Sequence, residues 1–114
     1  MNMALDYKRP TQQLEEELAF ARGEIETERD PDYVDQLRGV AAAIEWALGR
    51  ESVSPASFKV QPSPDWRGQL LEAVRAQEIE SGVRVMPDGM NKHYARGMAS
   101  ALRWTAGDTE DTPA

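Results

Sequence analysis

The chain has 114 residues, a formal net charge of −7, one histidine and no cysteine. This length suits a single domain that buries its core without disulfide bonds or a metal, and the missing cysteines exclude thiolate metal sites and Cys–His catalysis. The acidic charge opposes contact with a nucleic-acid backbone and no apolar run reaches the length of a membrane span, so we expect a cytoplasmic protein with no direct nucleic-acid partner and no membrane partner.

The first helix is predicted over residues 11–27. Its apolar side chains recur at helical spacing along one narrow stripe, made of Leu14, Leu18, Ala21 and Ile25. Phe20 lies about 140° away from this stripe by helical angle and stands near Gly23. These two residues are therefore a candidate contact point for a second chain.

Acidic residues gather in and after this helix. Residues 15–35 hold nine carboxylates against two arginines, a net charge equal to that of the whole chain. By helical angle the carboxylates surround the exposed face of the helix instead of forming one row. This spread favours a solvated surface over a ladder of charges that imitates phosphates.

The second helix is predicted from Asp30-Pro31 to Leu48. An aspartate that can cap the helix, followed by proline at the first helical position, is a strong start signal, and Gly49 is a typical C-terminal stop. The helix has two apolar sides. One is aliphatic, with Tyr33, Leu37, Val40, Ile44 and Leu48, and the other carries Gly39, Ala42, Ala43 and Trp46.

Two further helices are predicted. Ser63-Pro64-Asp65-Trp66 repeats the start signal for a third helix that ends near Ser81-Gly82, and a fourth begins between Asp88 and Asn91 and ends at Gly107. Residues 108–114 are predicted to be an acidic, disordered tail.

Residues 50–63 are long for a loop without structure. Phe58 and Val60 alternate with polar residues, as do Val83 and Val85. The two segments could pair as a short ribbon, or Phe58 and Val60 could pin the loop to the core. We favour the loop.

The chain contains an internal repeat. Residues 38–49 align without a gap with residues 96–107, and six of the twelve positions are identical. One helical hairpin cannot bury its own apolar faces, whereas two can. The repeat predicts an all-α fold, a four-helix bundle made of two αα-hairpins related by a pseudo-twofold axis. Residues 11–50 and 64–107 form the two hairpins of one domain that covers residues 1–107.

The repeated faces around Trp46 and Trp104 have two interpretations. They pack against each other in the core, or they form an external interface for a twin subunit or a partner. We favour the core, because indoles at regular helical spacing are more often packing residues. Arg38 and Arg96 occupy equivalent places before the repeated glycines. They either form ion pairs or pack their stems along the helix, or they are a symmetric pair of cationic anchors for an acidic partner. The sequence does not decide between these interpretations.

Catalytic motifs are missing. His93 is the sole histidine, the serines lack a G-x-S-x-G context, and the chain has no phosphate-binding glycine loop and no EF-hand spacing. We therefore predict a protein that is not an enzyme and has no cofactor, metal or catalytic residue.

The segment ARGMASALRW at residues 95–104, and its twin at residues 37–46, resemble short helical proteins of unassigned function from bacteriophages of actinobacteria. The composition, rich in arginine and poor in lysine, agrees with this resemblance. It implies a phage origin, and hence the cytoplasm of a host cell, and carries over no functional residue.

Together these observations predict a small acidic interaction protein that binds another protein or itself. The candidate interface residues are Phe20, Gly23, Arg38, Trp46, Arg96 and Trp104. The alternative is an acidic inhibitor that imitates nucleic acid and occupies the binding site of a host defence or regulatory enzyme.

Overall fold

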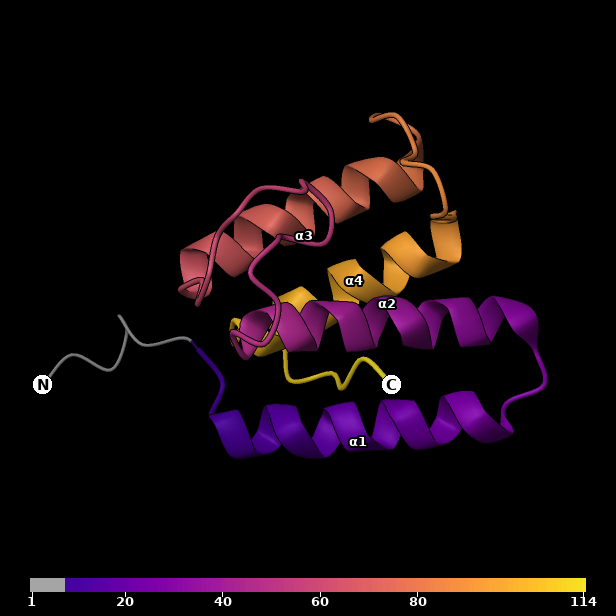
Figure 1. Cartoon of the computed structure of the whole chain (residues 1–114), viewed down its shortest axis with the longest axis horizontal. Coiled ribbons are helices and arrows are strands. Elements are labelled where there is room, and N and C mark those ends of the chain that lie inside the picture. Colours follow the sequence, from indigo (N-terminus) through magenta and orange to yellow (C-terminus); the bar gives the residue numbers. More distant parts are fainter. Residues whose placement is uncertain (1–7) are drawn as a thin grey trace, which may run out of the picture.

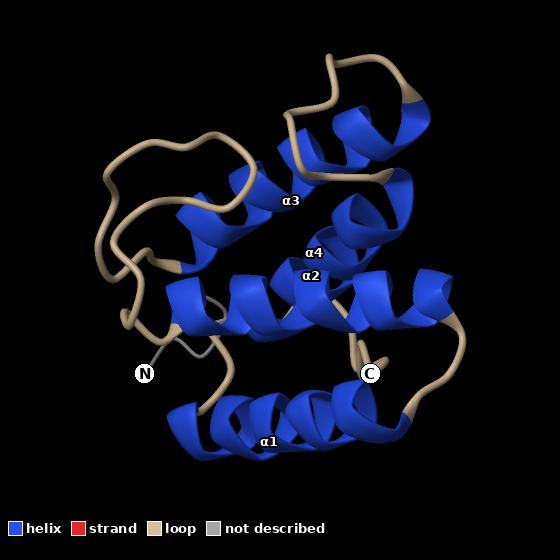
Figure 2. Cartoon of the chain, turned by 45° about the vertical axis from the view of Figure 1, so that its right-hand side comes forward, coloured by secondary structure: helices blue, strands red, loops and turns tan. Residues whose placement is uncertain are grey.

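The computed structural model describes residues 8–114, and this part of the chain forms four α-helices. They are α1 (Thr11–Thr27), α2 (Pro31–Ala47), α3 (Trp66–Ser81) and α4 (Lys92–Thr105). The helices α2 and α4 pack together at the centre, α1 covers α2, and α3 covers α4 (Figure 1; Figure 2). The predicted all-α four-helix bundle is confirmed.

Capping side chains explain where three of the helices begin. Asp30 accepts a hydrogen bond from the backbone N–H of Asp32, with Pro31 between them at the first helical position. Asp65 and Asn91 accept equivalent bonds at the starts of α3 and α4. These bonds satisfy N–H groups that have no partner inside the helix. The structure therefore places the helices where the start signals in the sequence predict them.

The core lies between α2 and α4 and under the two covering helices. The predicted aliphatic stripes of α1 and α2 are buried, with Leu14, Leu18, Leu37, Val40 and Ile44. Ile79 from α3 and Met98 and Leu102 from α4 are buried as well. Trp46 is fully buried and Trp104 is 4% exposed. Both indoles thus belong to the core of a single chain, as the packing interpretation predicts.

Gly39 and Gly97 make reciprocal contacts where α2 and α4 cross. A Cβ atom on Gly39 would overlap the backbone carbonyl of Tyr94, and one on Gly97 would overlap the backbone carbonyl of Gln36. Gly39 and Gly97 are 58 residues apart, and so are Gln36 and Tyr94, which is the repeat distance. Exchanging α2 with α4 therefore maps this contact onto itself, which is the signature of a twofold axis at the crossing.

The connection between α2 and α3 folds on itself. Val53 and Val60 form an isolated antiparallel bridge, and the Ser54 N–H donates to the Lys59 carbonyl at 2.8 Å. The ribbon with residues 83–85 does not form: Val60 pairs with Val53 instead, and Val83 and Val85 are exposed. Phe58 is 59% exposed and Val60 is exposed as well. The loop prediction is correct, but these two side chains do not pin the loop to the core.

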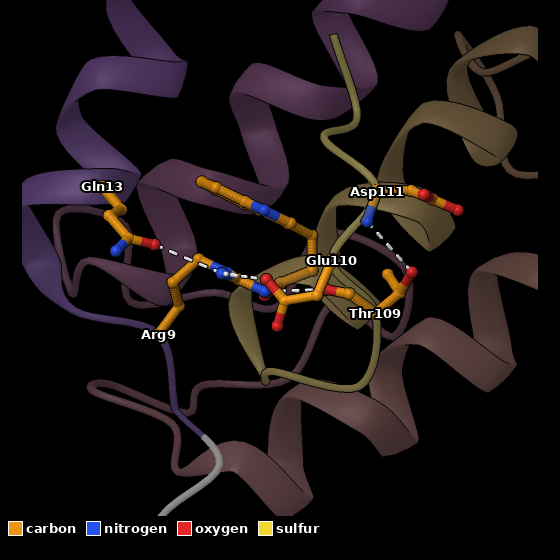
Figure 3. Close-up of polar contacts among 6 residues, drawn as sticks. Arg9, Gln13, Thr109, Glu110 and Asp111 are labelled. Carbon is orange, nitrogen blue, oxygen red and sulfur yellow. Dashed lines mark hydrogen bonds and ion pairs between the residues drawn. The ribbon is translucent and has the colours of Figure 1, made fainter.

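The sequence predicts a disordered tail, whereas the structure gives residues 108–114 a defined course along α1 (Figure 1). The physical reason is a set of bonds made by Arg9, which lies about 100 positions away in the sequence (Figure 3). Its guanidinium donates to the carbonyl oxygens of Trp104 and Thr109, both at 2.7 Å, and to Gln13 at 3.2 Å. It also stacks over the Trp104 ring and lies 3.5 Å from Glu110.

Candidate interaction surface

The structure does not bring the six predicted interface residues together. Trp46 and Trp104 are in the core, so they are not available to a partner. Phe20 is half-exposed on α1, and nothing lies within 4 Å of a Cβ placed on Gly23. These two residues remain on the surface as predicted.

Arg38 and Arg96 form surface ion pairs. Arg38 lies 3.7 Å from Asp35 on its own helix, and Arg96 donates to Glu80 of α3 at 2.6 Å. Both arginine side chains are more than half exposed. Exposed ion pairs of this kind contribute little free energy. The ion-pair interpretation therefore describes both residues.

A buried carboxylate holds the loop between α2 and α3. Glu72 of α3 is 4% exposed, and its carboxylate accepts bonds from the backbone N–H groups of Ala56 and Ser57 and from the Ser57 hydroxyl at 2.6 Å. These donors replace the water that the carboxylate loses on burial. The Trp46 indole N–H donates to the carbonyl of Gln61 at 2.9 Å. The loop is thus fixed on both sides of residues 58–60.

Phe58 stands between these fixed points with an unusual backbone. Its φ is +57°, a left-handed conformation that bulky residues rarely adopt, while its side chain is 59% exposed. Ser54 accepts bonds from the backbone N–H groups of Phe58 and Lys59, both at 3.0 Å, and holds this turn. Such conformations persist where the surroundings impose them, and they cluster at ligand-binding sites. No pattern in the sequence indicates this arrangement.

Phe58 borders a cleft of about 330 Å³ between this loop, α2 and α4, which we call the loop cleft. Its lining consists of Ala42, Glu45, Glu51, Val53, Ser54, Pro55, Phe58 and Tyr94. Burial raises the pKa of the Tyr94 phenol, which therefore stays neutral to a higher pH than usual. Glu45 pairs with Arg22, whereas Glu51 makes no ion pair within residues 8–114.

A second cleft of about 560 Å³, the tail cleft, lies between α2, α4 and residues 108–113. The two clefts are related by the pseudo-twofold axis, because seven residues of one stand 58 positions from a residue of the other. The pairs are Ala42/Ser100, Glu45/Arg103, Glu51/Thr109, Val53/Asp111, Ser54/Thr112, Pro55/Pro113 and Tyr94/Gln36.

The same axis relates the contacts that hold the loop and the tail. The Ala56 N–H donates to Glu72, and the Ala114 N–H donates to Glu17 at 2.9 Å. Ala56 and Ala114 are again 58 positions apart. The repeat therefore extends to residues 38–56 and 96–114, with eight of 19 positions identical, beyond the boundary at residue 107 that the sequence predicts.

His93, the sole histidine of the sequence, stands at the start of α4. His93 Nε2 lies 3.5 Å from an Asp32 carboxylate oxygen at the start of α2. Among residues 8–114, no three histidine, aspartate or glutamate side chains gather as metal ligands would. Within the same residues, no helix has both the length and the hydropathy needed to cross a membrane.

Comparisons with protein-family models, with curated protein sequences and with solved structures find no match to this chain.

Proposed function

We propose that this protein is a non-enzymatic interaction protein that binds a segment of another protein at the loop cleft. The observation that carries this proposal is Phe58, an exposed aromatic side chain held in a left-handed backbone conformation at the edge of the cleft. Aromatic side chains that bury large areas dominate the binding energy of protein interfaces.

The fixed loop adds to this argument. The bonds to Glu72 and from the Trp46 indole order the loop before any partner arrives. A preordered loop loses less conformational entropy on binding than a mobile one, so a small cleft can still bind usefully. Folding alone gives no reason to expose both Phe58 and Val53 at this cleft.

Photo-crosslinking from the loop tests the proposal in the native host. The residue at position 58 is replaced by a photoreactive phenylalanine, and the control carries the same group in place of the exposed Val85. We expect one discrete crosslinked species from position 58 and none from position 85, and we expect Val53→Asp to abolish it. Equal crosslinking from both positions, or none from position 58, would contradict the proposal.

Binding to a second copy is an outcome of the same experiment. A crosslinked species of twice the chain mass, together with a concentration-dependent sedimentation coefficient, would show that the partner is the protein itself. In that case the loop cleft is a self-association surface.

The nucleic-acid mimic remains an alternative proposal with less support. Two carboxylates of α1 are already engaged, since Glu15 pairs with Arg50 and Glu17 accepts from Ala114. Mimicry requires affinity that falls steeply with salt and collapses when Glu16 and Glu24 are reversed to lysine. The origin in a phage is a further proposal, which rests on the resemblance of residues 95–104 and 37–46 and on the composition.

A further inference from the structure

The tail cleft shows which features of the loop cleft the fold does not require. The two clefts share one scaffold, yet Val53 is matched by Asp111 and Tyr94 by Gln36. The backbone therefore accepts polar side chains at these positions. The shared scaffold thus does not impose Val53 and Tyr94 on the loop cleft, and binding gives a reason for them.

The charge of the two clefts differs in the same way. Glu51 at the loop cleft is matched by Thr109, and Glu45 is matched by Arg103. Glu45 is paired with Arg22, whereas Glu51 has no ion-pair partner within the part of the chain that the structure describes. Because the chain has a net charge of −7 and Glu51 has no ion-pair partner among residues 8–114, this carboxylate favours a cation over an anion at the loop cleft.

We propose that the loop cleft binds a partner segment in which an apolar side chain stands next to a lysine or arginine. The apolar side chain contacts Val53, Phe58 and Ala42, and the cation meets Glu51. A volume of about 330 Å³ is at the lower end of ligand pockets, so the cleft admits one or two side chains. This inference rests on the proposed function and adds the chemistry of the partner.

Small-molecule probes measure separately how apolar contact and how charge contribute to binding at the loop cleft. The wild-type protein is titrated with phenethylammonium, with neutral 2-phenylethanol and with anionic 3-phenylpropionate, and backbone amide shifts are followed by NMR. We expect the cation to bind roughly fivefold more tightly than the neutral probe, a difference of about 1 kcal/mol. The shifts should fall on Ala42, Val53 and Tyr94, and the anion should bind most weakly.

Two variants and a matched control complete the test. Glu51→Gln should reduce the preference for the cation to less than twofold, whereas Val53→Asp should weaken binding of both the cation and the neutral probe. Glu24→Gln changes a carboxylate of α1 that also has no ion-pair partner within residues 8–114 and should alter neither. The melting midpoint of each variant confirms that it is folded.

Equal affinity for the charged and neutral probes, shifts centred on Ser100 and Asp111, or no binding up to about 10 mM would overturn the inference. These results are distinct from failure of the proposed function. A specific crosslink from position 58 without a preference for the cation would leave the interaction and reject only this partner chemistry. A preference for the cation without a crosslink would reject the interaction proposed in the cell.

Discussion

Two glycines allow the close approach of the central helices α2 and α4. Gly39 and Gly97 lie against backbone carbonyls of the opposing helix, and no flexible side chain is present that could move aside. Glycine in a helix interior costs conformational entropy relative to alanine. The chain accepts this cost twice, at equivalent places, because the close approach of α2 and α4 leaves no room for a Cβ atom.

We predict that Gly39→Ala and Gly97→Ala each destabilise the protein by about 1–3 kcal/mol, since α2 and α4 must move apart. Gly23→Ala is the matched control, because its Cβ meets nothing and alanine favours the helix by about 0.5–1 kcal/mol. Urea unfolding of the three variants measures the change in unfolding free energy, which should be a loss for the two central variants and a gain for the control. Stabilisation by either central alanine would contradict the close crossing.

Tyr94 predicts a dependence of stability on alkaline pH. Burial raises its pKa in the folded state above the usual value of 10.0, so the unfolded chain releases this proton first as the pH rises. The contribution of the neutral Tyr94 phenol to folding stability is fully present below its pKa in the unfolded chain. It is lost as the pH rises through its pKa in the folded protein. Tyr94→Phe should therefore lose less stability than the wild type between about pH 8 and about pH 11. Urea unfolding at both pH values tests this, and identical losses would contradict it.

At the scale of elements, the loop between α2 and α3 is held by contacts that are not local. Glu72 binds residues about 15 positions earlier in the chain. The charged carboxylate of Glu72 stabilises the loop by accepting three hydrogen bonds. Hydrogen bonds to charged groups are each worth about 1.5–3 kcal/mol. The loop that carries Phe58 is thus held by a residue of α3.

Glu72→Gln is predicted to loosen this loop. An amide keeps one acceptor oxygen but replaces the other by an N–H₂ group, which cannot accept from Ser57. We expect a loss of about 1–3 kcal/mol and faster hydrogen exchange at Ala56 and Ser57. Glu17→Gln is the matched control, because it acts on the equivalent contact at Ala114 and should leave the loop unchanged. Slow exchange in Glu72→Gln would show that the loop is held otherwise.

The sequence predicts the elements better than the site. Helix starts are local, so Asp30-Pro31 and Asp65 indicate them without knowledge of the rest of the chain. The Gly/Ala/Trp faces are also readable, because helical spacing determines which side chains lie together. The loop cleft joins α2, the loop and Tyr94 of α4, and the ordered tail depends on Arg9. These contacts follow from tertiary packing, and no local pattern carries them.

At the scale of the whole molecule, the pseudo-twofold axis predicts that equivalent core residues have similar costs. Trp46 and Trp104 lie in equivalent positions and are both buried. Trp46→Ala and Trp104→Ala should each destabilise the protein by about 3–5 kcal/mol. Denaturant unfolding provides the measurement. An unchanged midpoint in either variant would show that its indole does not contribute to the core.

The equivalence of Ala56 and Ala114 implies that residue 114 could be connected to α1 in the way that the loop connects α2 to α3. Residues 57–63 join Ala56 to Pro64, and Arg9 is the counterpart of Pro64 when α1 is aligned with α3 through Glu17 and Glu72. Direct fusion of Ala114 to Met1 would leave residues 1–8 to make the equivalent connection, eight residues where the loop uses seven.

A circular permutant that starts at Ser57 and ends at Ala56 should therefore fold with the same helix content. We expect it to lose about 1–3 kcal/mol, because the bonds of Ser57 to Glu72 no longer lie within a continuous loop. Circular dichroism and urea unfolding measure both quantities. A permutant cut between Ala42 and Ala43, inside α2, should fail to fold. These results would show that the stability of the fold depends less on the order of the helices in the sequence than on the packing of α2 against α4.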